Sequence, residues 1–117
     1  MRIDLITCFL MGVMAIGQAW AASEVPETRV MSEAEWRELG TKRNCTLCHE
    51  MGPDALGPTL KDIAAEYAGD ADAERILLRK VYEGGVGKWG TTMMPSQSPP
   101  TSPEEIRALV RYMLSIK

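Results

Sequence analysis

The hydrophobic and polar positions follow a helical period near the end of the chain. Apolar residues recur there at i, i+3, i+4, i+7 and i+8, which is the stripe of an amphipathic helix. These positions are Ile106, Leu109, Val110, Met113 and Leu114. Ser102 precedes the stripe as a helix cap, Pro103 as the first helical residue and Glu105 as the third. The pattern predicts a C-terminal helix with one apolar face.

Three earlier segments show the same period. A capping box of Ser32 and Glu35 starts a helix that contains Trp36 and Leu39. A second helix is predicted from Leu60 to Gly69, and a third from Asp70 or Asp72 to the Gly84-Gly85 pair. Their predicted inward-facing residues are Ile63, Ala64 and Tyr67 in the second helix and Ile76, Leu77, Val81 and Tyr82 in the third.

The segments between these helices are rich in glycine and proline. Residues 52–58 and 84–100 are therefore predicted to be loops. No alternating, strand-like run is evident. The predicted fold class is all-α, with about four short helices tied by long loops.

The N-terminal residues have the pattern of a secretory signal. A positive start at Arg2 is followed by an apolar run, Leu5–Ile16, and an A-x-A cleavage pattern that ends at Ala21. The run is shorter than the roughly 20 residues of a spanning helix, which argues against the alternative of an uncleaved anchor. We expect cleavage after Ala21 or Ala22 and export to the periplasm. Residues 1–21 are thus assigned to the signal, 22–31 to a flexible lead-in and 32–117 to the domain.

Removal of the signal changes the length and the cysteine content of the chain. It leaves 96 of 117 residues, enough for one small domain, and because Arg2 and Asp4 leave together the net charge stays −3. This weak acidity argues against a nucleic-acid partner. Cys8 leaves with the signal, so only Cys45 and Cys48 remain.

These two cysteines form the clearest motif in the chain. Cys45, Cys48 and His49 make the C-x-x-C-H pattern of c-type haem attachment. At about 100° per helical residue, all three side chains point to one side. Two thioethers to the vinyl groups and one imidazole on the iron would then hold a single covalent haem c.

Three other functions of the C-x-x-C-H motif account for fewer of its features. A redox dithiol would need a βαβ context and leaves His49 without a role. Structural zinc takes four Cys or His ligands, and only three remain after signal removal. A disulfide closing so short a loop would stabilise little.

His49 is the only histidine, so the second axial ligand has to be another residue type. Methionine is the partner of histidine in cytochromes c. Met51 is too close to His49 to reach the opposite face, and Met113 belongs to the apolar stripe of the last helix. Met93 and Met94, in the loop before Pro95, remain as candidates.

Four stretches together resemble one family. They read CTLCH, GPTLKDIAAEYAG, WGTTMMP and SPEEIRALVRYMLS. They are similar to short bacterial monohaem class I cytochromes c, the cytochrome c-551/c-552 type, over residues 32–117. The resemblance implies the cytochrome c fold wrapped around one haem, with the methionine before the proline as the distal iron ligand. That methionine is Met94, with Met93 as the alternative.

The same resemblance implies further cofactor-binding residues. The carbonyl of Pro58 would accept a hydrogen bond from the Nδ1–H of His49 and raise its donor strength; simple stiffening of a loop is compatible with this. The indole N–H of Trp89 would meet a haem propionate, unless the ring only packs in the core. Lys80 falls where the family often has an arginine near a propionate, but lysine lacks the bidentate fork.

These residues indicate an electron carrier and not an enzyme. Iron with two strong axial ligands changes oxidation state only, and no histidine is left for acid–base chemistry. The expected partners are periplasmic redox proteins such as a reductase, oxidase, peroxidase or dehydrogenase, met by a monomer without stable membrane insertion. Lys42, Arg43, Lys61 and Lys88 could rim the haem edge or be ordinary solvated charges.

Two alternative functions stay open, and a third is rejected. The chain could be the haem subunit of a larger periplasmic dehydrogenase. Dissociation of Met94 would instead give a ligand-binding or peroxidatic haem protein. Gly85 to Gly90 formally match G-x-G-x-x-G, but the strand–turn–helix setting of a nucleotide site is missing.

Overall fold

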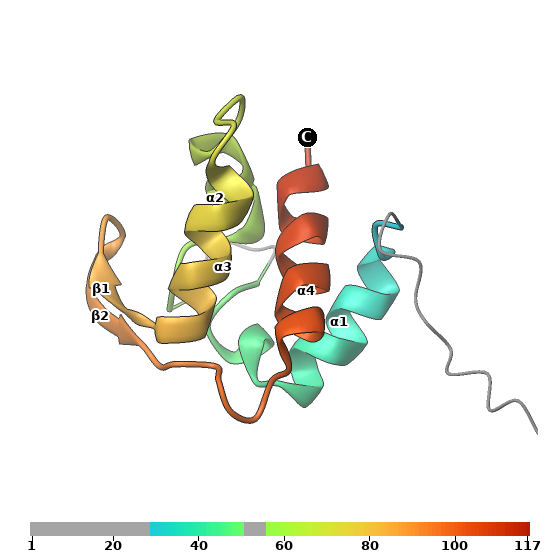
Figure 1. The fold of residues 1–117 in the computed structure, drawn as a ribbon. Helices are drawn as coiled ribbons and strands as arrows, with labels where there is room; N and C mark the ends of the chain where they lie inside the picture. Colours follow the sequence, from blue (N-terminus) through green and yellow to red (C-terminus); the bar gives the residue numbers. More distant parts are fainter. Residues whose placement is uncertain (1–28, 51–55) are drawn as a thin grey trace, which may run out of the picture.

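A computed structural model describes residues 29–50 and 56–117. It contains four helices, one 3₁₀ turn and a β-hairpin (Figure 1). In chain order these are α1 (Glu33–Lys42), η1 (Cys45–Leu47), α2 (Leu60–Glu66), α3 (Ala73–Glu83), β1 (Gly85–Gly87), β2 (Gly90–Met94) and α4 (Pro103–Ser115). The predicted signal, most of the lead-in and Met51 lie outside the described residues. In the described part of the chain, no helix is long and apolar enough to span a membrane.

Three of the four helices begin with a complete capping box. In each, a hydroxyl caps the third backbone N–H of the helix while an acidic side chain returns to the cap N–H. The pairs are Ser32 with Glu35, Thr59 with Asp62, and Ser102 with Glu105. The boxes at Ser32 and Ser102 were predicted from the sequence and are confirmed.

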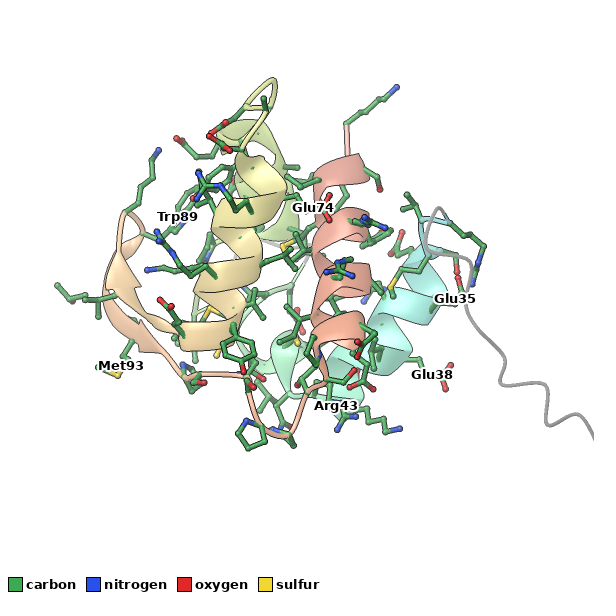
Figure 2. The ribbon with its side chains drawn as sticks, in the orientation of Figure 1. Glu35, Glu38, Arg43, Glu74, Trp89 and Met93 are labelled. Carbon is green, nitrogen blue, oxygen red and sulfur yellow. The ribbon has the colours of Figure 1, made fainter. Side chains whose placement is uncertain are left out.

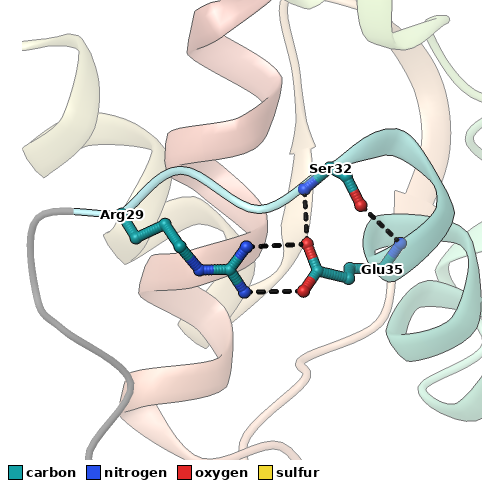
Figure 3. Close-up of polar contacts among 3 residues, drawn as sticks. All are labelled: Arg29, Ser32 and Glu35. Carbon is teal, nitrogen blue, oxygen red and sulfur yellow. Dashed lines mark hydrogen bonds and ion pairs between the residues drawn. The ribbon is translucent and has the colours of Figure 1, made fainter.

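The box of α1 is reinforced from the preceding segment (Figure 3). The Arg29 guanidinium donates two hydrogen bonds to the Glu35 carboxylate, at 2.6 and 3.1 Å, and the Ser32 N–H donates a third at 2.7 Å. The hydrogen bonds from Arg29, with smaller effects of those from Ser32, hold the pKa of Glu35 down at about 2. The carboxylate that caps α1 therefore stays ionised at neutral pH.

Helix α4 is the element on which the others pack. It contacts α1, α2 and α3, and α3 runs beside it (Figure 1). Ile106 and Val110 of α4 are among the most deeply buried side chains, and so is Leu60 of α2. On the α1 side, the Trp36 and Tyr112 rings lie with centroids 6.0 Å apart. Because α4 packs against three other helices, the apolar stripe predicted from its sequence forms the centre of the core.

The hairpin departs from the prediction of a loop over residues 84–100. β1 and β2 pair antiparallel, with Gly85 opposite Met94 and Gly87 opposite Gly90, and a register irregularity lies between them. Its residues are exposed along nearly the whole of both strands, and three are glycines. The alternation that marks a half-buried strand is therefore missing, which explains why the sequence pattern did not show it.

Tyr82 also departs from its prediction. It was predicted to face inward, but 49% of its surface is exposed. The buried line of α3 is Ala73, Leu77 and Val81, each four residues from the next. Tyr82 follows Val81 by one residue and so is turned about 100° away from that line.

An ion pair joins the end of α1 to the start of α4. The Arg43 guanidinium donates to the Glu105 carboxylate at 2.8 Å, across 62 positions of sequence, and both side chains are mostly buried. Arg43, with a smaller effect of the Ser102 N–H, lowers the pKa of Glu105 below its ordinary value of 4.5. The pair fixes the segment leading into η1 against the central helix.

We predict that Glu105→Gln, which keeps a side-chain oxygen to accept the Ser102 N–H but removes the charge, destabilises the protein at neutral pH by about 1 kcal/mol. A lowered carboxyl pKa adds stability that is complete above the unfolded value and is lost as the pH falls below 4.5 through the folded value. The melting temperature should thus drop by about 4–8 °C at pH 7, and the difference should shrink in acid.

Glu33→Gln is the matched control, because Glu33 pairs with Arg37 on the exposed face of α1. It should leave the melting temperature unchanged within error. A Glu105→Gln protein as stable as the parent at pH 7 would contradict a stabilising role for the Arg43 pair.

Candidate functional site

The C-x-x-C-H cluster is placed by a left-handed residue at the end of α1. Asn44 has φ 62°, and its N–H donates to the Thr41 carbonyl at 3.1 Å. Asparagine is one of the few residues that adopt this conformation readily. The chain then turns directly into η1, so the cluster follows α1 without a loop.

The cluster begins with a 3₁₀ turn, Cys45–Leu47, and Cys48 is its C-cap, whereas the sequence prediction assumed an α-helical turn. The Cys48 N–H donates to the Cys45 carbonyl at 3.2 Å, which is the i to i+3 hydrogen bond of a 3₁₀ turn. The His49 N–H returns to the Cys45 carbonyl at 2.9 Å, which closes an α-type turn. Both cysteines are free thiols, and burial raises the pKa of the Cys45 thiol. All three side chains line one cavity.

The imidazole of His49 is oriented by the segment Gly57-Pro58. Its Nδ1 lies 2.9 Å from the Pro58 carbonyl oxygen. A carbonyl can only accept, so Nδ1 carries the proton and donates, which leaves the lone pair of Nε2 for a metal. This is the contact that the family resemblance implied for Pro58.

Gly57 allows the Gly57-Pro58 segment to lie close to the His49 ring. Its N–H donates to the Cys48 carbonyl at 2.8 Å. A Cβ added at Gly57 would lie 3.0 Å from His49 Cε1 and 3.2 Å from Nδ1. Only a residue without a side chain fits there without displacing the imidazole.

The hairpin brings the predicted distal residue to the same cavity. Met94, the last residue of β2, is half-buried, packs against the core and lines the cavity. Met93 precedes it on the strand, also borders the cavity and is 70% exposed. Figure 2 shows the Met93 side chain pointing away from the helices. Successive strand residues face opposite sides, so the strand directs Met94 and not Met93 toward the interior.

Trp89 and Lys80 both lie on the hairpin side of the cavity. Trp89 lies in the two-residue turn between the strands and is 44% exposed. Lys80 of α3 donates to the Val86 carbonyl at 2.9 Å. Both line the cavity (Figure 2 labels Trp89), but among residues 29–50 and 56–117 no acceptor is found for the Trp89 indole. Their predicted contacts with a propionate remain predictions.

The six residues that match G-x-G-x-x-G form β1, the turn and the first residue of β2. Within that turn, Lys88 forms an ion pair with Glu66 of α2. The three glycines therefore belong to a β-hairpin, which the Lys88–Glu66 ion pair connects to α2. Among the described residues, no helix directly follows them. This is the setting that the sequence analysis found incompatible with a nucleotide site.

Two properties of the cavity were missed by the sequence analysis. Leu109 was predicted only as part of an apolar helix face and Trp36 only as part of the first helix, and both form part of the cavity wall. Of the four basic residues proposed as its rim only Lys88 lines it, together with Arg79 and Lys80. Helical periodicity shows which residues are buried, but not whether they are buried against protein or against a cofactor.

The cavity fits the predicted cofactor. Its volume is about 400 Å³, and most of its wall is apolar, contributed by α1, α2, α3 and α4. Two free thiols and an imidazole with an available Nε2 stand in it, and cationic side chains lie at the hairpin side. An apolar macrocycle with two anionic substituents and a metal matches this distribution of groups.

Comparison with known proteins gives the same answer. The Cytochrome c family model matches residues 34–117. The chain is 42% identical over 78 residues to cytochrome c-551 of Allochromatium vinosum, a match that covers 67% of this chain and 82% of that protein. The crystal structure of Nitrosomonas europaea cytochrome c552 superposes with a TM-score of 0.64 at 38% identity, over 69% of this chain and 99% of that one.

A more distant structure agrees. Class 1 cytochrome MtoD from Sideroxydans lithotrophicus superposes with a TM-score of 0.59 at 30% identity, over 73% of this chain and 97% of that one. These matches confirm both the resemblance and the all-α fold predicted from the sequence. The chain belongs to the cytochrome c family and, as a monohaem electron carrier of that family, holds one covalent haem c at its C-x-x-C-H cluster.

Proposed function

We propose that this cytochrome is a periplasmic one-electron shuttle whose haem iron is bound by His49 Nε2 and Met94 Sδ. The observation that carries the proposal is that both side chains line a single apolar cavity next to the attachment cysteines. The haem supplies the one-electron couple between ferric and ferrous iron. The residues of the chain position it, exclude water and set its potential.

Support for the proximal ligand comes from its hydrogen bond. With Nδ1–H committed to the Pro58 carbonyl at 2.9 Å, the ring has one tautomer and one orientation. Donation from Nδ1 increases electron density at Nε2, which favours the more highly charged metal state. The chain thereby lowers the potential through a backbone carbonyl whose position depends on Gly57.

Support for the distal ligand comes from composition and burial. His49 is the only histidine of the chain, and a neutral thioether favours the lower oxidation state. Met94 is half-buried in the cavity wall, whereas Met93 is 70% exposed. An imidazole on one side and a thioether on the other leave no coordination position for a substrate, which agrees with electron transfer without turnover.

The exposed surface near the cavity supports transient contact with other redox proteins. Leu56 and Met93 line the cavity and are 74% and 70% exposed, with Arg79, Lys80 and Lys88 nearby. A small apolar contact beside cationic groups suits a brief encounter with an acidic partner. Location in the periplasm rests on the signal pattern of residues 1–21 and on bacterial relatives.

Replacement of Met94 by alanine should abolish the weak long-wavelength band that a sulfur-to-ferric-iron charge transfer gives. Absorption spectra of the matured ferric protein measure this directly. Met93→Ala is the matched control and should retain the band, because Met93 is exposed. A band that survives in Met94→Ala and disappears in Met93→Ala would assign the ligand to Met93 instead.

Gly57→Ala should raise the reduction potential. Its methyl group would lie 3.0 Å from His49 Cε1, so the ring shifts and its hydrogen bond to Pro58 weakens. We expect a rise of up to about 60 mV in a redox titration, which is the one-electron equivalent of about 1.4 kcal/mol. Gly40→Ala, whose Cβ meets Trp36 and Thr46 at ordinary distances of 3.4 Å or more, should leave the potential unchanged. An unaltered potential in Gly57→Ala would show that this hydrogen bond does not tune the haem.

Gel filtration separates a shuttle from a subunit of a larger dehydrogenase. Purified from its native periplasm at moderate salt, the protein should elute as a monomer. Elution of all the haem with a larger polypeptide, unchanged at high salt, would contradict the shuttle and support the permanent subunit.

A further inference from the structure

We propose that Ser96 is a positioning residue that keeps Met94 in the cavity by holding the chain after it on the C-terminal end of α3. The proposal rests on Met94 being the distal ligand, as argued above. It concerns a different property, which is the ease with which another ligand can replace Met94. The evidence is the geometry around the last turn of α3.

The final carbonyls of a helix have no partners within it and must be satisfied from elsewhere. At the end of α3 two such partners come from the segment that directly follows Met94. The Ser96 hydroxyl donates to the Tyr82 carbonyl at 2.7 Å, and the Gln97 N–H donates to the Val81 carbonyl at 3.1 Å. The segment is therefore attached to α3 by two adjacent hydrogen bonds.

Gly84 allows the segment to approach this closely. It is the C-cap of α3, with φ 71° and ψ −150°, a conformation that favours glycine. A Cβ at Gly84 would lie 2.4 Å from the Met94 carbonyl oxygen and 2.6 Å from the Ser96 nitrogen. Both atoms belong to the backbone, so a side chain at Gly84 would have to displace the Met94 segment itself.

These contacts lie within two residues of the ligand. Between Met94 and Ser96 stands Pro95, whose ring fixes φ, so the three residues move together. Displacement of the Met94 backbone from the cavity would lift this stretch from α3 and break the Ser96–Tyr82 hydrogen bond. The hydroxyl of Ser96 thus opposes replacement of Met94.

Imidazole binding to the ferric holoprotein tests the proposal, because imidazole binds the iron only when Met94 leaves it. Ser96→Ala should bind imidazole about five-fold more tightly, the effect of losing one neutral hydrogen bond. Ser96→Thr, which retains a hydroxyl, should stay close to the parent. In Ser96→Ala the Gln97 amide should also exchange its hydrogen faster, since it bonds to the same helix end.

Ser115→Ala is the matched control. The Ser115 hydroxyl donates to the Tyr112 carbonyl at 2.6 Å at the end of α4, and Ser115 does not line the cavity. This variant loses the same kind of bond at another helix end and should bind imidazole like the parent. Equal affinity in Ser96→Ala and the parent, or an equal increase in Ser96→Ala and Ser115→Ala, would overturn the proposal.

A second pair of variants tests the same contact by crowding. Gly84→Ala should bind imidazole at least ten-fold more tightly, because its methyl group displaces the Met94 backbone. Gly69→Ala is its control, since Gly69 has φ 78° but nothing within 4 Å of an added Cβ. Equal affinities in these two variants would contradict the account.

Failure of this inference is separable from failure of the proposed function. If Met94→Ala keeps the sulfur band, the ligand assignment is wrong. If Met94→Ala loses the band while Ser96→Ala binds imidazole like the parent, the ligand assignment stands and only the role of Ser96 is rejected.

Discussion

The apolar residues that hold the four helices together are also the residues that enclose the cavity. Trp36, Leu60, Leu77 and Leu109, from four different helices, are all at least nine-tenths buried and all line it. A domain this small cannot build a large core from side chains alone. Since the same walls serve packing and cofactor binding, a covalent haem anchored by the cluster would complete the core.

The two sides of the site come from distant parts of the sequence and are fixed by different means. On the side of the cysteine cluster, Cys48 and His49 are joined to the Gly57-Pro58 segment by two hydrogen bonds that set the His49 ring. On the distal side, a hairpin carries Met94 and α3 receives the chain that follows. In both places a glycine permits contact between backbones, and the neighbouring backbone positions a side chain. Such a site can change its oxidation state with little rearrangement.

Most of this arrangement could be predicted from the sequence, because its determinants are local. The C-x-x-C-H spacing, the capping boxes at Ser32 and Ser102 and the stripe of α4 each lie within a few residues, and each is read from residue type alone. The resemblance to known cytochromes added Pro58, whose carbonyl then proved to lie at hydrogen-bond distance from His49. It also favoured Met94 over Met93.

The remainder depends on tertiary contacts that leave no periodic signal. Glycine-rich, exposed strands gave no alternation, so the hairpin was read as a loop. Gly84 was read only as a helix stop, because nothing in its neighbourhood shows that the Met94 backbone would come within 2.4 Å of its missing Cβ. The Arg43–Glu105 ion pair spans 62 positions and could not be predicted from the sequence around either residue.

The central claim is that one imidazole and one thioether bind the iron in both oxidation states. X-ray absorption at the iron edge, recorded on the ferric and the ferrous holoprotein, tests it most directly. The account predicts one sulfur and five nitrogen neighbours in each state, with little change in their distances. A sulfur neighbour that is absent in either state, or replaced by a lighter atom, would contradict the account and point to an iron with an exchangeable position.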